Sequence, residues 1–172
     1  MARLLVLVAT IGAALANPEH ARSKMILKNT GNEDLALYFM GSIDDGDMSM
    51  WDGSETLNAI VEPGGATARY VRFNDSFAIR SGDMQWRTRL SLYRNDHDAQ
   101  PYKISFHNVM VEEEPSPIEL KHHDEGYIWI DPNNHVTHSA VGGHEFSLRD
   151  KDSAERLAVS IHELDATELG EP

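Results

Sequence analysis

The chain has 172 residues, with 15 lysines and arginines against 28 aspartates and glutamates, and a formal net charge of −13. A length of this order accommodates one domain of medium size or two small ones. The excess of acidic residues disfavours nucleic acid and anionic membranes as partners, because both are negatively charged. The sequence contains no cysteine, which excludes disulfides, thiol nucleophiles and zinc–thiolate sites.

Residues 1–16 have the features of a secretory signal peptide. Arg3 gives a positive start, an uncharged apolar run follows, and the sequence Ala-Leu-Ala ending at Ala16 fits cleavage by signal peptidase. The alternative is an uncleaved anchor, but the apolar run is short for a bilayer. We expect a mature protein that begins at Asn17, is secreted or lies in the lumen of the secretory pathway, and has no membrane segment after cleavage.

The rest of the chain has the pattern of short β-strands separated by turns. Apolar runs at 25–27 and 35–40 are followed by a long acidic segment at 41–55. The next clear strand, 86–93, alternates between two faces. One face would carry Trp86, Thr88, Leu90 and Leu92, and the other Arg87, Arg89, Ser91 and Tyr93. Because no stretch shows a sustained helical period, the sequence predicts an all-β fold.

Residues 59–83 align without a gap with residues 128–152, an offset of 69 positions that is compatible with a structural repeat. Phe77 falls on Phe146, and both follow a turn signal and begin an alternating strand, so we expect both to be buried. Outside this stretch the same offset places Leu35 on Ile104.

We therefore predict a β-sandwich built from two repeats, the first half (24–96) and the second half (102–164), followed by an acidic tail (165–172). The segment 112–124 would be a long loop of the second half. The sequence leaves open whether the two halves form one sandwich or two.

The second half contains a short motif, Gly-His-x-Phe-x-Leu-Arg at 143–149, preceded by His138 and Ser139. In this motif the chain resembles the β-domain family of the von Hippel–Lindau tumour suppressor. The first half keeps only the end of the motif and has Asp75 in place of His144. The resemblance implies a β-sandwich that recognises peptides, in the best-known member a hydroxyproline. It implies ligand-binding roles for Ser139, Gly143, His144 and Phe146.

Histidines are concentrated in the second half, but the sequence predicts no metal site and no cofactor. His135 and His138 would project to opposite faces of a strand, so they could not chelate one ion together. His122 and His123 are expected to be solvated in a loop. The acidic run at 44–47 lacks the spacing of a calcium loop.

Catalytic residues are weakly indicated, because Ser139 lies near His138 and His144 but no nucleophile elbow surrounds it. Asn74-Asp75-Ser76 is a sequon for N-glycosylation of Asn74 at a predicted turn.

These features together favour a secreted, non-enzymatic binding module. Its ligand would be an extended peptide, proline-rich or containing hydroxyproline, or a glycan, bound in the second half. The alternatives are a structural or matrix component that self-associates through sheet edges, or a small hydrolase.

Overall fold

A computed structural model describes residues 23–42, 54–82, 87–95, 102–109, 116–122, 126–150, 155–164 and 168. Within these residues the secondary structure consists of β-strands. They are β1 (Ser23–Asn29), β2 (Leu35–Ser42), β3 (Thr56–Val61), β4 (Ala66–Val71), β5 (Asp75–Ser81), β6 (Arg87–Arg94), β7 (Tyr102–Asn108), β8 (Ile118–His122), β9 (Tyr127–Ile130), β10 (His135–Ala140), β11 (Glu145–Arg149) and β12 (Glu155–Glu163). In this part of the chain no helix has the length and apolar character needed to cross a membrane. The all-β prediction is confirmed.

Three predicted segments lie outside the described residues, in whole or in large part. The signal peptide (1–16), the acidic run at 44–47 and, apart from residue 168, the acidic tail (165–172) cannot be compared with the structure, because they are not described. The loop predicted at 112–124 was wrong. The predicted loop at 112–124 contains a strand, β8, which ends at His122. Its sequence, Ile-Glu-Leu-Lys-His, alternates as a strand does, but the glutamates and prolines that precede it favoured a loop.

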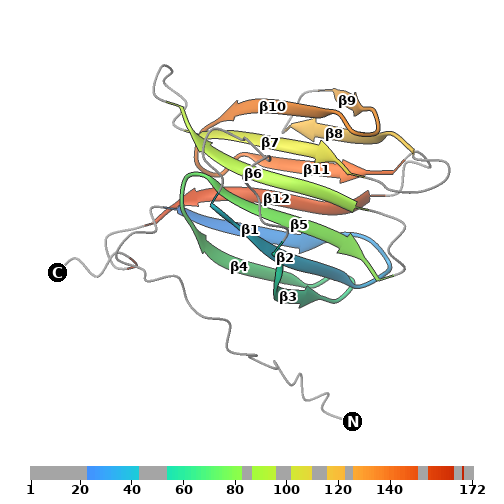
Figure 1. Cartoon of the computed structure of the whole chain (residues 1–172), viewed down its shortest axis with the longest axis horizontal. Helices are drawn as coiled ribbons and strands as arrows, with labels where there is room; N and C mark the ends of the chain where they lie inside the picture. The colour runs from blue at the N-terminus through green and yellow to red at the C-terminus, as the bar shows by residue number, and fades with distance from the viewer. Residues whose placement is uncertain are drawn as a thin grey trace, which may run out of the picture.

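The strands form two six-stranded antiparallel sheets that pack face to face as one sandwich (Figure 1). Sheet A has the order β4-β1-β12-β11-β8-β9, and sheet B has the order β10-β7-β6-β5-β2-β3. Each sheet contains strands from both halves of the chain, since β1 and β4 join sheet A while β7 and β10 join sheet B. Neither half therefore forms a sheet of its own.

The two sheet orders are related by a shift of six strands. Replacing each strand of sheet A by the strand six places away in the chain order gives the order of sheet B. The strand that corresponds to β2 is thus β8, and the strand that corresponds to β1 is β7. Leu35, which pairs with Val61, corresponds to Ile118, which pairs with Ile130. The alignment of Leu35 with Ile104 was therefore wrong.

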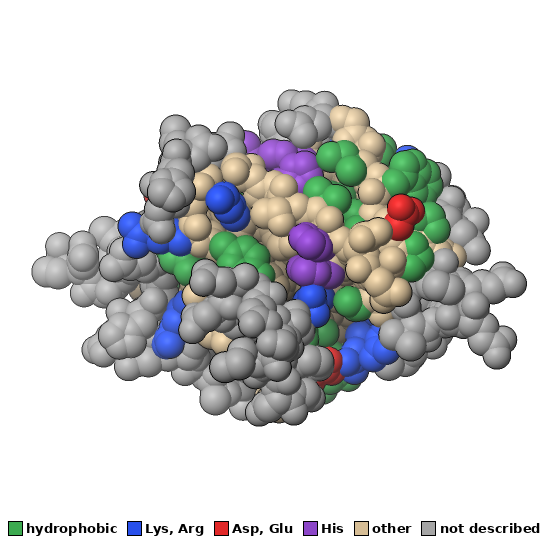
Figure 2. Space-filling model, turned by 45° about the horizontal axis from the view of Figure 1, so that its top comes forward, with side chains coloured by type: hydrophobic (Ala, Val, Ile, Leu, Met, Phe, Trp, Pro, Cys, Tyr) green, Lys and Arg blue, Asp and Glu red, His purple; other side chains and the backbone are tan. Residues whose placement is uncertain are grey.

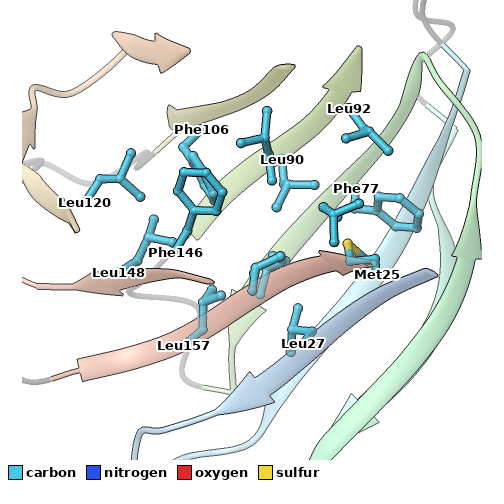
Figure 3. Close-up of a cluster of buried hydrophobic side chains, with 14 of the residues drawn as sticks. Met25, Leu27, Phe77, Leu90, Leu92, Phe106, Leu120, Phe146, Leu148 and Leu157 are labelled. Carbon is cyan, nitrogen blue, oxygen red and sulfur yellow. The ribbon is translucent and has the colours of Figure 1, made fainter. Parts of the chain in front are cut away.

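The core lies between the sheets and is contributed by the inward side chains of both halves (Figure 3). Phe77 and Phe146 are 3% and 0% exposed, which confirms that both are buried. The ring of Phe146 packs against the ring of Phe106 from the opposite sheet, with centroids 5.2 Å apart. The alternation predicted for 86–93 is confirmed where it is described, because Leu90 and Leu92 are buried.

The turns between strands have the backbone conformation that their residues favour. Gly64 (φ 72°) and Asn133 (φ 62°) both adopt positive φ in the turns after β3 and β9. Asn74 (φ 74°) and Gly143 (φ 87°) do so in the turns after β4 and β10. Glycine and asparagine tolerate this region better than other residues, so these four positions were recognisable as turns from the sequence.

Candidate functional site

Three histidines from separate elements of the second half come together at one end of the sandwich. His122 ends β8, His138 lies in β10, and His144 lies in the turn between β10 and β11. The strands β8 and β10 belong to different sheets, so the sandwich itself brings these side chains close. We call His122, His138 and His144 the histidine group.

Ring contacts and a hydrogen bond connect the histidine group. His122 Nε2 lies 2.9 Å from His144 Nδ1, and the ring centroids of His122 and His138 are 5.3 Å apart. The ring of His122 stacks on Phe146, with centroids 4.4 Å apart and an interplanar angle of 10°. In the His122–His144 hydrogen bond one ring nitrogen donates and the other accepts, so the two rings fix each other's orientation.

His122 was expected to be a solvated loop residue, and this expectation was wrong. Its side chain is only 8% exposed and lies against Phe146. On β8 it follows the inward positions Ile118 and Leu120, so strand alternation points it into the sandwich.

The four site residues predicted from the sequence have different environments. Phe146 is fully buried, so it supports His122 and offers no surface to a ligand. His144 is half-buried, whereas Gly143 is exposed and donates its N–H to the Ile161 carbonyl at 2.7 Å. The structure thus joins His144 to Phe146 through His122.

Ser139 lies on the opposite face of β10 from His138. Val136 and Ala140 pack in or against the core. His138 lies between them on the same face of the strand and therefore faces inward. Ser139 faces outward, and its hydroxyl accepts a hydrogen bond from Asn95 Nδ2 at 3.3 Å.

The corresponding end of the first half has a carboxylate where the second half has His144. Asp75 accepts hydrogen bonds from Ser42 Oγ at 2.7 Å and from the Arg72 amide at 2.9 Å. Burial raises the pKa of Asp75, and the two hydrogen bonds and the charge of Arg72 oppose that shift. The first half therefore has a structural buried acid at this place.

The predicted glycosylation site lies at a turn, as expected. Asn74 has positive φ, and its backbone N–H donates to the Leu92 carbonyl at 2.6 Å. The sequon hydroxyl of Ser76 is fully buried and shares a hydrogen bond of 2.8 Å with Ser91. Modification of Asn74 stays a prediction.

A depression lies beside His144 in the described part of the chain. Gly142 and Gly143 line a shallow depression together with His162 and Glu163 of β12. The described residues contain no group of three side chains arranged to hold a metal ion.

The sequence did not predict that His122 and His138 lie in one group with His144. His122 was assigned to a loop, and His138 was considered only together with His135. The alternation of β8 was the one signal that placed His122 inside the sandwich. Nothing local in the sequence indicates that β8 and β10 meet across the two sheets.

Comparisons with known proteins found no relative. No protein-family model matches the sequence, and neither the curated proteins nor the solved structures that were searched gave a match.

Proposed function

We propose that this protein is a secreted, non-enzymatic binding module that takes up an extended peptide by strand addition at β10. Among the described strands, β10 pairs with β7 alone and forms the edge of sheet B. An edge strand presents a row of unpaired N–H and C=O groups, to which an extended peptide can add as a further strand. This open edge is the observation that carries the proposal.

The side chains of β10 and its neighbouring turn supply polar contacts for such a peptide. His135, Thr137 and Ser139 alternate along the outward face of β10. Alternate side chains of an added strand would lie beside them. His144 lies half-buried after the end of β10, next to this edge.

The matching edge of the first half is chemically different. Strand β4 forms the edge of sheet A, and it presents Ala66, Ala68 and Tyr70 at the positions that correspond to His135, Thr137 and Ser139. Alanine offers no side-chain hydrogen bond, which favours the second half as the binding edge.

We propose that the two halves are copies of one six-stranded unit related to the von Hippel–Lindau β-domain. The shift relation between the two sheet orders supports a duplication, and the motif around His144 supports the relationship. Because of this proposed relationship, proline-rich and hydroxyproline-containing peptides are the first ligands to test, and glycans are the second class.

Self-association is the second candidate, and exposed apolar side chains on other edge strands favour it. Trp129 of β9 is 52% exposed and Ile60 of β3 is 59% exposed, and both strands are sheet edges. Two such edges could pair between molecules. A hydrolase is less favoured, because the hydroxyl of Ser139 is hydrogen-bonded to an amide and not to a base.

The test is binding of the mature protein to arrays of extended peptides and of glycans. Ser139→Arg places a bulky cation on the outward face of β10, and Tyr70→Arg makes the matched change on β4. We expect Ser139→Arg to abolish peptide binding and Tyr70→Arg to leave it unchanged. N-methylation of alternate backbone amides of the best peptide should also abolish binding, since it removes main-chain donors.

Equal loss from both variants, or no binding by the parent protein, would overturn the proposal. Retention on the glycan array alone would replace the peptide by a glycan. Sedimentation over a range of protein concentrations tests self-association, which predicts assembly that increases with concentration.

A further inference from the structure

The outward face of sheet B carries a polar network that spans three adjacent strands. Arg89 of β6 donates from Nη2 to His107 Nδ1 on β7 at 2.8 Å. His107 Nε2 lies 3.2 Å from Ser105 Oγ, and Thr137 Oγ1 of β10 donates to the same oxygen at 3.1 Å. The ring of His135 stacks on His107, with centroids 4.8 Å apart. We call Arg89, Ser105, His107 and Thr137 the Arg89 network.

The protonation of this network follows from its donors. A guanidinium has no acceptor, so His107 Nδ1 must accept from Arg89, and His107 Nε2 carries the hydrogen and donates to Ser105. Burial, the charge of Arg89 and the neighbouring His135 lower the pKa of His107 to about 3. His107 is therefore neutral at ordinary pH, and Arg89 carries the positive charge of the network.

The network has more donors than acceptors. Ser105 Oγ accepts two hydrogen bonds and retains its own hydrogen to donate. Arg89 Nε is buried and has no hydrogen-bond partner among the described residues. Arg80 is paired with Glu55, Arg149 with Glu119 and Arg156 with Asp150, whereas none of the described carboxylates pairs with Arg89. A desolvated cation without a counter-ion is costly.

The corresponding face of sheet A shows that the fold does not need this network. In sheet B, Arg89 stands opposite His107 and Ser105 opposite Thr137. At the corresponding positions of sheet A, Ala158 stands opposite Lys28 and Ile26 opposite Ala68. Ala158 is well buried, so an alanine fills the place of Arg89 in the other sheet.

We propose that the Arg89 network is a binding site for a small oxyanion, namely a carboxylate, sulfate or phosphate group. Guanidinium groups bind such anions through two parallel N–H···O bonds, and Arg89 Nε and the Ser105 hydroxyl are the donors without a described acceptor.

Further basic side chains surround the network, because Lys103 and Arg87 lie on the same face. The outward positions of β5, β6, β7 and β10 contain no aspartate or glutamate, and the arginine of β5, Arg80, is paired with Glu55. Among the described residues, the outward side of β6 and β7 therefore carries basic and no acidic side chains although the chain is acidic. Figure 2 shows purple histidine side chains next to blue side chains of lysine or arginine near the centre of its view.

The site shares Thr137 with the peptide-binding edge proposed for β10, but its charge comes from Arg89 of β6, so the two are tested with separate probes and variants. The probes are sodium phosphate, sodium sulfate and sodium acetate, each titrated into the mature protein by calorimetry against sodium chloride of equal ionic strength. Arg89→Ala removes the cation and introduces alanine, the residue that sheet A has at the corresponding position, Ala158. Arg87→Ala removes an equal charge two residues away on the same face and serves as the matched control.

We expect the parent and Arg87→Ala to bind at least one oxyanion with equal affinity and Arg89→Ala to bind it about tenfold more weakly or worse, because a charged hydrogen bond is lost. Absence of binding by the parent, or equal loss from the two variants, overturns the site. If Arg89→Ala fails to fold, the Nε–H resonance of Arg89 in the parent decides. A shift on addition of phosphate but not of chloride supports the proposal, and an unchanged resonance overturns it.

Discussion

Asn29 and Asn108 make the same hydrogen bonds in the two halves of the chain. Each is buried at the end of its strand, with 1% and 0% of its surface exposed. Asn29 Nδ2 donates to the Val61 carbonyl at 2.7 Å, and Asn108 Nδ2 donates to the Ile130 carbonyl at 2.9 Å. Each side-chain amide also donates to a carbonyl in the segment that follows its own strand, that of Glu33 for Asn29 and that of Ser116 for Asn108. The two asparagines thus fix the ends of β3 and β9 in the same way.

Replacing either asparagine by aspartate should destabilise the protein strongly. Aspartate has the same shape but cannot donate while ionised, so Asn29→Asp and Asn108→Asp each leave one buried and one partly buried carbonyl facing a buried charge. We expect each to lower the free energy of unfolding by about 2–4 kcal/mol, measured by urea denaturation. Asn134→Asp, at an exposed turn position, is the control and should have little effect. If Asn108→Asp matched that control, the hydrogen bonds assigned to Asn108 would be wrong.

Much of the fold was predictable because it depends on local patterns. Alternation placed Leu90 and Leu92 in the core, and turn residues such as Gly64 and Asn133 marked the strand ends. The correspondence of Asn29 with Asn108 was not predictable from the constant offset. Connections of different length before β3 and β9 change the spacing of the earlier strands, so a single offset aligns only the later strands of each half.

The candidate sites were less predictable, because they depend on which strands become neighbours. Alternation did place Arg89 on the polar face of its strand, but His107 and Thr137 reach it only through the order of sheet B. For the same reason the contact of His122 with His138 joins two sheets and leaves no local signal in the sequence.

Phe146→Ala should cost about 3–5 kcal/mol of folding free energy, because it leaves a cavity beside Phe106 and removes the support of His122. Phe77→Ala, at the corresponding position of the first half, should cost a comparable amount. Thermal or urea unfolding measures both changes. An unaltered midpoint for Phe146→Ala would show that the ring is not packed in the core.

His107 should make the protein less stable in acid. Its pKa is lowered from 6.5 to about 3 in the folded protein, so the unfolded chain takes up the proton first as the pH falls. The contribution of neutral His107 to the free energy of unfolding is fully present above its pKa in the unfolded chain. It is lost progressively as the pH falls from that value toward the pKa in the folded protein. We expect a loss of about 1–2 kcal/mol near pH 5, after allowance for the partial exposure of the ring. His107→Gln keeps an acceptor and a donor, and its unfolding free energy should depend less steeply on pH. Identical slopes for the parent and the variant would contradict the prediction.

His144→Ala should weaken peptide binding without unfolding the protein. The change removes a half-buried ring and one hydrogen bond to His122, a loss of about 1 kcal/mol in stability. Asp75→Ala makes the corresponding change in the first half and should leave binding intact where the variant remains folded. The measurement is titration of the best peptide from the array. Equal loss of affinity in both variants would show that binding is not confined to the second half.

The mature N-terminus should be Asn17. Edman sequencing or intact-mass measurement of secreted protein checks this directly. Protein that keeps Met1 and sediments with membranes would show that residues 1–16 act as an anchor.

The exchange of strands between the two halves ties them together mechanically. Because β1 pairs with β12 and β6 pairs with β7, a single cut in the connection between β6 and β7 would leave two fragments that stay associated through two strand pairs and a shared core. A half produced alone could complete neither sheet, because each sheet takes strands from both halves. It could complete a sandwich only by recruiting a second copy of itself, as a domain-swapped dimer does.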